Sequence, residues 1–159
     1  MDAATDREWI KFKHAHFTAR FPADFRYSKS HYFMHEQPGE PGLWRVGFTK
    51  FATRMLGELV DFQFPVADGG AVTPGMEIGW VEGFKAASDV FCVMEGAFAG
   101  TNAALAADAC IVRTDPWITG WLYAVRGVPE EGHLSAQEYI DYLSGIIDRM
   151  AQERHGEES

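Results

Sequence analysis

The spacing of the hydrophobic residues changes once along this chain, from a repeat of two to the repeat of an α-helix. Up to about residue 130, apolar residues alternate with polar or small ones in short runs between turns such as HEQPGEPG at 35–42. This alternation is typical of half-buried β-strands. The later segment 135–153 has helical spacing, with an apolar stripe of Ile140, Leu143, Ile147 and Met150. The pattern predicts a mainly β domain, a compact barrel or sandwich with peripheral helices.

The individual elements can be placed by residue range. Strands are expected at 43–48 (LWRVGF), 58–64 (ELVDFQF), 76–81 (MEIGWV), 89–94 (DVFCVM) and 120–127 (GWLYAVRG). Residues 49–57 predict a short helix, with Thr49 able to cap its start and Gly57 able to end it. Ser135 and Glu138 form a capping box at the start of the C-terminal helix. We expect the apolar stripe of this helix to cover the barrel wall.

Length and charge narrow the functional classes. The chain has 159 residues, which suits one domain, and a formal net charge of -9 with a pI of about 5.0. An acidic domain repels phosphate backbones, so nucleic-acid binding is not expected. No apolar run reaches the roughly 20 residues that span a bilayer, and no secretory signal is evident. Cys92 and Cys110 lack zinc-site spacing and have apolar neighbours, which predicts two reduced thiols and a cytoplasmic protein.

No pattern of catalytic or metal-binding residues stands out. His14 and His16 would share one face of a strand, but no Cys, Asp or Glu joins them at ligand spacing. His31 and His35 are four residues apart in a segment with no helical pattern. A nucleophile elbow, a phosphate-binding glycine loop and a Ser-His-Asp order are all missing. The chain is therefore not expected to be an enzyme.

A lysine at the predicted tip of a hairpin is the remaining candidate. In WVEGFKAASDVF, residues 80–91, Lys85 lies between two strand-like arms, with Glu82 before it and Asp89 after it. Most lysines are simply solvated. A lysine that receives a covalent modification, however, must project from the fold so that a modifying enzyme can reach it, and this setting favours that interpretation.

Motifs along two thirds of the chain resemble those of the glycine cleavage system H-protein family. The family reads S-H-E-W, V-G-I-T-D-Y-A-x-x-x-L-G-D-x-V, E-S-V-K-A-x-S-D, V-S-G-E, N-E-A-L and D-P-Y-x-x-G-W. In the same order and at similar spacing this chain has SHYF (30–33), VGFTKFATRMLGELVDF (46–62), EGFKAASD (82–89), VMEG (93–96), NAAL (102–105) and DPWITGW (115–121). The related biotin carriers resemble M-K-M, which Phe84 and Ala86 do not match.

The resemblance implies a barrel-sandwich hybrid fold of the lipoyl-domain type, with a short internal helix and a C-terminal amphipathic helix. It divides the chain into an N-terminal extension, residues 1–25, and a carrier domain, residues 26–159, that includes the helix at 135–153. Lys85 corresponds to the lysine that carries lipoate in an amide bond. Glu82, Gly83, Ala86 and Asp89 correspond to the hairpin that the lipoylating enzyme reads. Gly96 corresponds to a turn that faces this hairpin across the barrel.

The resemblance also implies a non-catalytic carrier within a multienzyme system. A lipoate ligase or a lipoyl/octanoyl transferase would attach the cofactor. The arm would then carry an aminomethyl group from a pyridoxal-phosphate-dependent glycine decarboxylase to a folate-dependent aminomethyltransferase, and dihydrolipoyl dehydrogenase would reoxidise it. Ser30, His31, Tyr32 and Asp89 correspond to a cleft that holds this cargo.

Two departures from the family pattern keep other functions open. Tyr32 replaces an acid that would hold the charged cargo, and Lys50 replaces the usual acid of the following motif. One alternative is an H-like lipoyl carrier for another pathway, such as sulfur-compound oxidation or a lipoyl relay. Another is an interaction module without lipoate, although the intact Glu82 and Lys85 argue against it.

Overall fold

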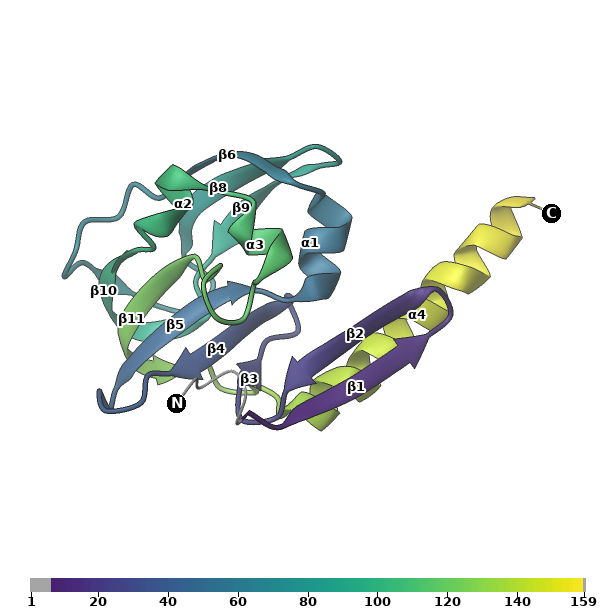
Figure 1. Cartoon of the computed structure of the whole chain (residues 1–159), viewed down its shortest axis with the longest axis horizontal. Helices are drawn as coiled ribbons and strands as arrows, with labels where there is room; N and C mark the ends of the chain where they lie inside the picture. The colour runs from purple at the N-terminus through teal and green to yellow at the C-terminus, as the bar shows by residue number, and fades with distance from the viewer. Residues whose placement is uncertain (1–6, 159) are drawn as a thin grey trace.

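The strands form an open barrel of two facing antiparallel sheets, with a separate hairpin beside it (Figure 1). The computed structural model describes the backbone of residues 7–158 and the side chains of residues 7–154. The larger sheet has the order β3-β4-β5-β11-β10-β7, from Arg26–Tyr27, Tyr32–Glu36, Leu43–Phe48, Tyr123–Pro129, Met94–Thr101 and Ala71–Val72. The smaller sheet has the order β6-β8-β9, from Leu59–Gln63, Glu77–Gly83 and Ala87–Phe91. This arrangement confirms the predicted barrel-sandwich fold.

The first hydrophobic core fills the space between these two sheets. Its fully buried members include Val46, Ile78, Val81, Val90 and Val125, and Val81 and Val90 alternate with exposed neighbours along their strands. The alternation that the sequence shows is therefore the alternation between the inside and the outside of the barrel. Two short helices, α2 (Ala104–Ala107) and α3 (Ile111–Thr114), connect β10 to β11 and cover one end of this core with Leu105 and Val112.

The internal helix α1 spans Lys50–Leu56, as predicted. Gly57 ends it with a φ of 78° and donates its N–H to the carbonyl oxygen of Thr53. Thr49 occupies the N-cap position, but its side chain makes no capping hydrogen bond. The Thr49 hydroxyl lies 2.9 Å from the hydroxyl oxygen of Tyr139 instead. The predicted capping role of Thr49 is wrong, because its side chain joins the helix start to the C-terminal helix.

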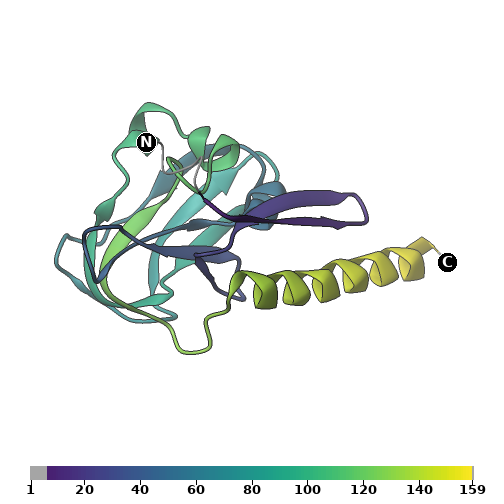
Figure 2. The same ribbon diagram turned by 60° about the horizontal axis from the view of Figure 1, so that its bottom comes forward.

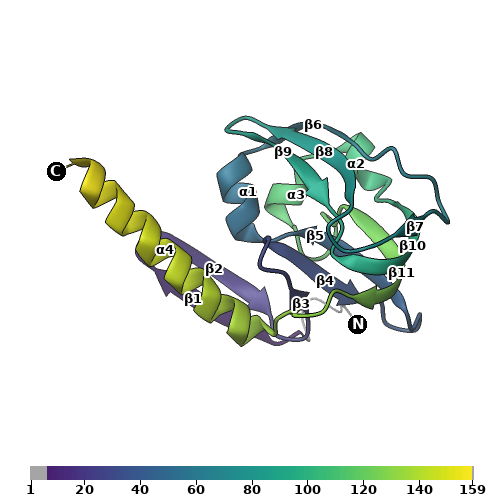
Figure 3. The same cartoon turned by 180° about the vertical axis from the view of Figure 1, so that it is seen from behind.

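A second hydrophobic core joins a hairpin and the C-terminal helix to residues of the barrel, among them Tyr27, Phe33 and Phe51. Strands β1 (Trp9–His14) and β2 (Phe17–Pro22) pair with each other and lie alongside α4 (Ala136–Glu158), as Figures 2 and 3 show from two sides. The core residues from the hairpin and the helix are Phe12, Phe17, Ala19, Phe21, Ala136, Tyr139, Ile140 and Leu143. An exposed hydrogen bond of 2.6 Å between His14 Nε2 and Asp148 Oδ1 joins the same two elements.

The position of α4 corrects one expectation and confirms another. Its apolar stripe belongs to a core that contains residues of the β1–β2 hairpin as well as Tyr27, Phe33 and Phe51 of the barrel, so the barrel wall is only part of the surface that α4 covers. The capping box is present: Glu138 N–H donates to Ser135 Oγ at 3.2 Å, and Ser135 N–H donates to Glu138 Oε1 at 2.9 Å. The hydrogen bond from the Ser135 N–H lowers the pKa of Glu138. None of the described helices combines the length and the apolarity that crossing a membrane requires.

Candidate functional site

Lys85 lies at the tip of the β8–β9 hairpin, where the sequence pattern predicts it. Strand β8 ends at Gly83 and β9 begins at Ala87, so the intervening turn is only three residues long. The N–H of Gly83 donates to the carbonyl oxygen of Ala86 at 2.8 Å and closes the turn. The side chains of the turn residues, including Phe84 at 75% exposure, are open to solvent. A modifying enzyme can therefore approach the lysine from outside the barrel.

Main-chain hydrogen bonds seat this turn on the C-terminal end of α1. The N–H of Lys85 donates to the carbonyl oxygen of Leu56 at 2.9 Å, and the N–H of Phe84 donates to that of Glu58 at 3.0 Å. The last carbonyl groups of a helix have no partner inside the helix. The turn supplies N–H donors to carbonyl groups at the end of α1, and these hydrogen bonds fix the position of the hairpin tip relative to the helix.

The lysine side chain also points to α1. Its Nζ donates to the carbonyl oxygen of Arg54 at 3.1 Å, in the last turn of the helix. The helix dipole places partial negative charge at this end, which favours a cation there. Among the described side chains, no carboxylate forms an ion pair with Lys85.

Two glycines allow this close contact between the turn and the helix. A Cβ on Gly83 would collide with the carbonyl group of Leu56. A Cβ on Gly57 would lie 3.0 Å from Cγ of Lys85 and 3.1 Å from its main-chain nitrogen, and the positive φ of Gly57 disfavours a side chain there as well. Sequence reasoning assigned Gly57 only to the end of the helix. It missed Arg54 and Leu56, because both accept hydrogen bonds from Lys85 through their main-chain carbonyl oxygens. Every residue has such a group, so the identity of the side chain gives no signal.

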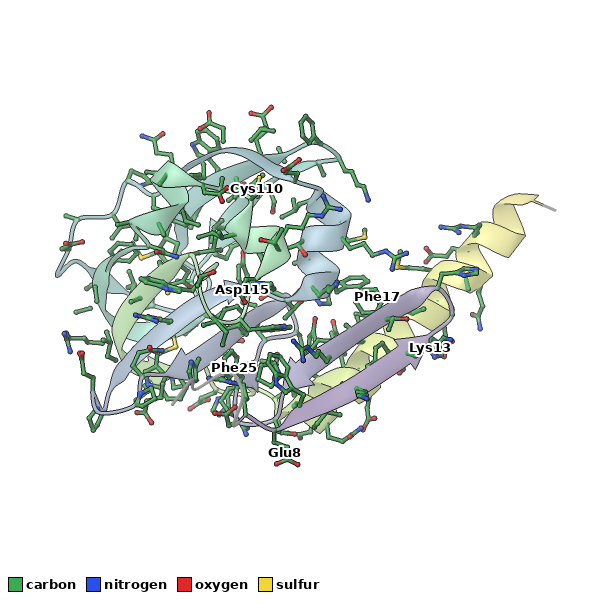
Figure 4. All side chains as sticks on the ribbon, in the orientation of Figure 1. Glu8, Lys13, Phe17, Phe25, Cys110 and Asp115 are labelled. Carbon is green, nitrogen blue, oxygen red and sulfur yellow. The ribbon has the colours of Figure 1, made fainter. Side chains whose placement is uncertain are left out.

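Two cavities meet at Lys85 and Arg54, which line both of them. The first has a volume of about 470 Å³, and five of its eight lining residues are charged: it is lined by Lys50, Thr53, Arg54, Gly57, Glu58, Phe84, Lys85 and Arg113. The second has a volume of about 570 Å³ and lies between α1, the tip of the β1–β2 hairpin and the far part of α4. Figure 4 shows Phe17, which lines this second cavity, between the hairpin and α1.

Glu82 and Asp89 lie together on the outer face of the hairpin. In the β8–β9 register, Glu82 is opposite Ala87 and Trp80 is opposite Asp89. The four side chains therefore share one face of the sheet, and they line a depression of about 330 Å³. Both carboxylates are exposed, three residues before and four residues after the lysine.

The four expected cleft residues lie on different elements, and the cargo cleft stays a prediction. Tyr32 is only 4% exposed and belongs to the barrel core, where its ring stacks on Phe48 at 5.3 Å and its hydroxyl accepts the N–H of Phe91. Ser30 is exposed, and its hydroxyl bonds that of Ser28 at 2.7 Å. Asp89 is on the outer face of β9. His31 stands just before β4, with a positive φ of 72°.

His31 faces the second core. Its Nδ1 lies 2.8 Å from the hydroxyl oxygen of Tyr139, and its ring packs against Phe51 and Tyr142. Burial lowers the pKa of His31 to about 4, so the ring is neutral at physiological pH. It therefore joins the barrel to α4 through a neutral hydrogen bond.

Gly96 lies within strand β10, opposite Gly127 of β11, and not in a turn. The expected turn is replaced by continuous pairing with β11 and β7. A Cβ at Gly96 would collide with the carbonyl oxygen of Arg126. The small residue is required here because two main chains approach closely.

Both cysteines are free thiols, as predicted. Cys92 is buried, whereas Cys110, labelled in Figure 4, is partly exposed and donates a hydrogen bond to Glu58 Oε1 at 2.7 Å. This hydrogen bond and the nearby negative charge raise the pKa of Cys110 to about 11. The thiol form therefore predominates at neutral pH. Among the described residues, no group of three His, Cys, Asp or Glu side chains could hold a metal ion.

A barrel that presents an exposed lysine at the tip of a hairpin, itself hydrogen-bonded to a helix end, defines the class of lipoyl-domain-like carriers. Comparisons with known proteins agree with this class. The profile of the family described as "Glycine cleavage H-protein" matches residues 25–144. The glycine cleavage system H protein of Corynebacterium jeikeium is 36% identical over 118 residues, covering 74% of this chain and 91% of the relative. That of Pseudoalteromonas atlantica is 32% identical over 140 residues, covering 88% and 98%.

A solved structure indicates the same family. The crystal structure of a glycine cleavage system H protein from Mycobacterium marinum aligns with a TM-score of 0.66 and 34% sequence identity, covering 75% of this chain and 95% of that one. The chain belongs to the glycine cleavage H-protein family, whose members are lipoyl carriers of the glycine cleavage system. Proteins of this family carry lipoate on a lysine and are non-catalytic subunits. The β1–β2 hairpin and the last part of α4 lie outside the matched residues.

Proposed function

We propose that Lys85 carries lipoate and that the chain serves as the aminomethyl carrier of a glycine cleavage system. The observation that supports this most is the position of Lys85, which is exposed at the tip of a hairpin. Five main-chain and side-chain hydrogen bonds hold this tip in place, three of them from the turn to α1 and one to Glu58 just beyond the helix. A fixed base and a free side chain are what a swinging arm needs. The carrier then acts by keeping its cargo at a high local concentration near successive enzymes.

The residues around Lys85 fit a lipoyl group. The Lys85 amine can attack the acyl carbon of a lipoyl adenylate, which the ligase forms with ATP; the bond to AMP breaks, the nitrogen loses a proton, and an amide results. The neutral amide keeps one N–H, which can still donate to the Arg54 carbonyl oxygen. When bound, the lipoyl group would supply a disulfide that opens to accept the aminomethyl group on one sulfur, and the dithiol left after transfer would be reoxidised to the disulfide. Glu82, Gly83, Ala86 and Asp89 present the hairpin to the lipoate ligase or the lipoyl/octanoyl transferase.

The partners follow from the family. Interaction with enzymes of the glycine cleavage system is a family property, and we propose the decarboxylase, the aminomethyltransferase and dihydrolipoyl dehydrogenase as the individual partners. We also retain the division into residues 1–25 and 26–159 as a proposal. The packing of α4 on the β1–β2 hairpin means that the two parts share one core.

A lipoyl carrier for another pathway remains the second candidate, for one specific reason. Where the family has an acid for the charged cargo, this chain has Tyr32, and its side chain fills the barrel core. A carrier whose cargo has no positive charge would not need that acid.

In vitro lipoylation followed by loading tests both candidates. With lipoate ligase, ATP and lipoic acid, the intact mass should rise by one lipoyl group. Lys85→Arg should abolish the rise, whereas Lys50→Arg, which changes another lysine lining the same cavity, should not. Labelled glycine and glycine decarboxylase should then add one aminomethyl group. Loading of a control H protein, but not of this lipoylated chain, would favour the second candidate.

A further inference from the structure

A further cavity, with a volume of about 400 Å³, lies where the open end of the β1–β2 hairpin meets α1 and α3. Trp9 and Arg20 line it from the hairpin, Lys50 from the first position of α1, and Arg113 from α3. The other lining residues belong to the segment 114–118 at the end of α3 and after it. Lys85 does not line this cavity, so it is distinct from the candidate lipoylation site.

The cavity gathers positive charge in an acidic chain. Arg20, Lys50 and Arg113 are all exposed, and in the described part of the chain none of them forms an ion pair. Asp115, labelled in Figure 4, is the one acid in the lining, and its Oδ2 accepts a hydrogen bond of 2.8 Å from the Thr119 hydroxyl. Three cations around one cavity repel one another, although the whole chain has a formal net charge of -9. An anion bound among them would remove this repulsion.

An aromatic contact orients one of the three cations. The guanidinium carbon of Arg20 lies 4.2 Å from the ring centroid of Trp9, which is the geometry of a cation–π interaction. This contact holds a long side chain that would otherwise be free to move in solvent. A guanidinium group presents several N–H donors in a fixed plane, and this arrangement matches the oxygens of a phosphate or a carboxylate.

Two of the three cations have no counterpart in the family pattern. Arg20 and its partner Trp9 precede residue 25, where the match to the family profile begins. Lys50 stands where the family motif has an acid, so the charge at this position is reversed. The cavity is therefore a feature of this chain, and a ligand there would be additional to the carrier function.

The charge and the size of the cavity select the ligand. A phosphate monoester carries a charge of about -1.5 to -2 at neutral pH and has three strong acceptor oxygens, whereas a monocarboxylate carries a single charge. Three cations against one carboxylate therefore favour phosphate. A long polyanion would be repelled by the rest of this acidic chain. The volume of about 400 Å³ falls in the range of about 300–1,000 Å³ for small-molecule sites.

We propose that this cavity binds the phosphate group of a small molecule through Arg20, Lys50 and Arg113. The two guanidinium groups donate hydrogen bonds to the phosphate oxygens, and the Lys50 ammonium supplies a further positive charge. Trp9 keeps Arg20 in place and, with Ile118, offers apolar surface to the remainder of the ligand. Binding is non-covalent and does not depend on a modification of Lys85.

NMR of the tryptophan indole N–H groups tests this proposal directly. The chain has five tryptophans, at positions 9, 44, 80, 117 and 121, and two of them line the cavity. The unmodified full chain is titrated with pyrophosphate at constant ionic strength, which sodium chloride maintains. We expect the signals of Trp9 and Trp117 to shift and to saturate. The Trp80 signal should stay in place, because Trp80 is on the outer face of the smaller sheet and does not line the cavity.

Matched variants separate a site from general attraction to positive charge. Arg20→Gln and Arg113→Gln should each raise the Kd for pyrophosphate by about tenfold or more, because each removes a charge-assisted hydrogen bond. Lys11→Gln is the control, since Lys11 is exposed, lies opposite Arg20 in the hairpin register and does not line the cavity. It removes the same charge and should change the Kd by less than about twofold. All three positions are exposed, so the variants should fold.

A second titration, with ADP, distinguishes the two sources of the phosphate group. Tighter binding of ADP than of pyrophosphate supports an organic phosphate as the ligand, and equal binding supports inorganic phosphates. An equal loss of affinity in Lys11→Gln and Arg20→Gln overturns the site, because the chain would then attract anions through its overall basic face. Absence of shifts at Trp9 and Trp117 overturns it as well. Neither result affects the proposed lipoylation, because the titrations use the unmodified chain and leave Lys85 unchanged.

Discussion

Lys85 and Arg54 are joined by a hydrogen bond of 3.1 Å from the lysine Nζ to the main-chain carbonyl oxygen of the arginine. The residues are 31 positions apart, and the bond brings the hairpin tip to the last turn of α1. The amide that lipoylation creates retains a donor, so the same contact can orient the arm at its root. The arm's base is therefore set by a helix end, and only the part beyond the amide needs to move.

Gly83→Ala should weaken the contact between the hairpin tip and the end of α1. Its Cβ would collide with the carbonyl group of Leu56, and overpacking of this kind destabilises a fold by about 1–3 kcal/mol. We expect a lower free energy of unfolding in denaturant titration and slower lipoylation. Gly145→Ala is the control, because a Cβ there meets nothing within 4 Å and lies in a helix. Equal stability of Gly83→Ala and the parent would contradict the close packing of the turn.

Glu82→Ala should slow lipoylation with little effect on stability. Glu82 is exposed on β8, and surface changes usually alter stability by only about 0.5 kcal/mol in either direction. Glu77→Ala is a matched control at the other end of the same strand, also exposed. The measurement is the initial rate of lipoylation by intact mass. If both variants are modified at the same rate, the ligase does not read Glu82.

Tyr32→Glu should destabilise the barrel. The Tyr32 side chain is buried against Phe48, and a carboxylate there would be removed from water without a partner, at a cost of several kcal/mol. Tyr32→Phe keeps the ring and loses only the acceptor for the Phe91 N–H, for which we expect a loss of about 1 kcal/mol. Thermal unfolding compares the two. A Tyr32→Glu variant as stable as Tyr32→Phe would place this side chain in a solvated cleft after all.

The His31 side chain should make stability depend on pH in a defined window. Its pKa is about 4 in the folded chain because burial disfavours the cation, and about 6.5 in an unfolded chain. Between these values the unfolded chain binds more protons, so the contribution is fully present above pH 6.5 and is lost as the pH falls toward 4. We expect the stability difference between pH 7 and pH 4.5 to shrink in His31→Asn. Asparagine tolerates the positive φ of 72° at this position.

His35 provides a parallel test of the same argument. Burial, with a further contribution from Arg7, lowers its pKa to about 4 as well. His35→Gln should therefore reduce the pH dependence in the same window, and the double variant should reduce it further. An unchanged pH dependence in all three variants would show that the two rings are not buried in the neutral form.

The strands and the lysine hairpin could be predicted from the sequence because their signals are local. Alternation along LWRVGF and around Lys85 reflects which side of a strand is buried, and the pattern needs no knowledge of the partner strand. The β1–β2 hairpin was harder to predict from the sequence, because WIKFKH and FTARFP gain their burial from α4, more than a hundred residues away. The motif around Tyr32 suggested a cleft, but whether a phenol fills a core or lines a cleft depends on its distant neighbours Phe48 and Phe91.

The most direct test of the account is fragment-ion mass spectrometry of the peptide that contains Lys85, from chain purified from its native cells. We predict one lipoyl group, located on Lys85, with every other lysine unmodified. An unmodified Lys85 in cells whose other lipoyl proteins are modified, or a lipoyl group on a different lysine, would contradict it.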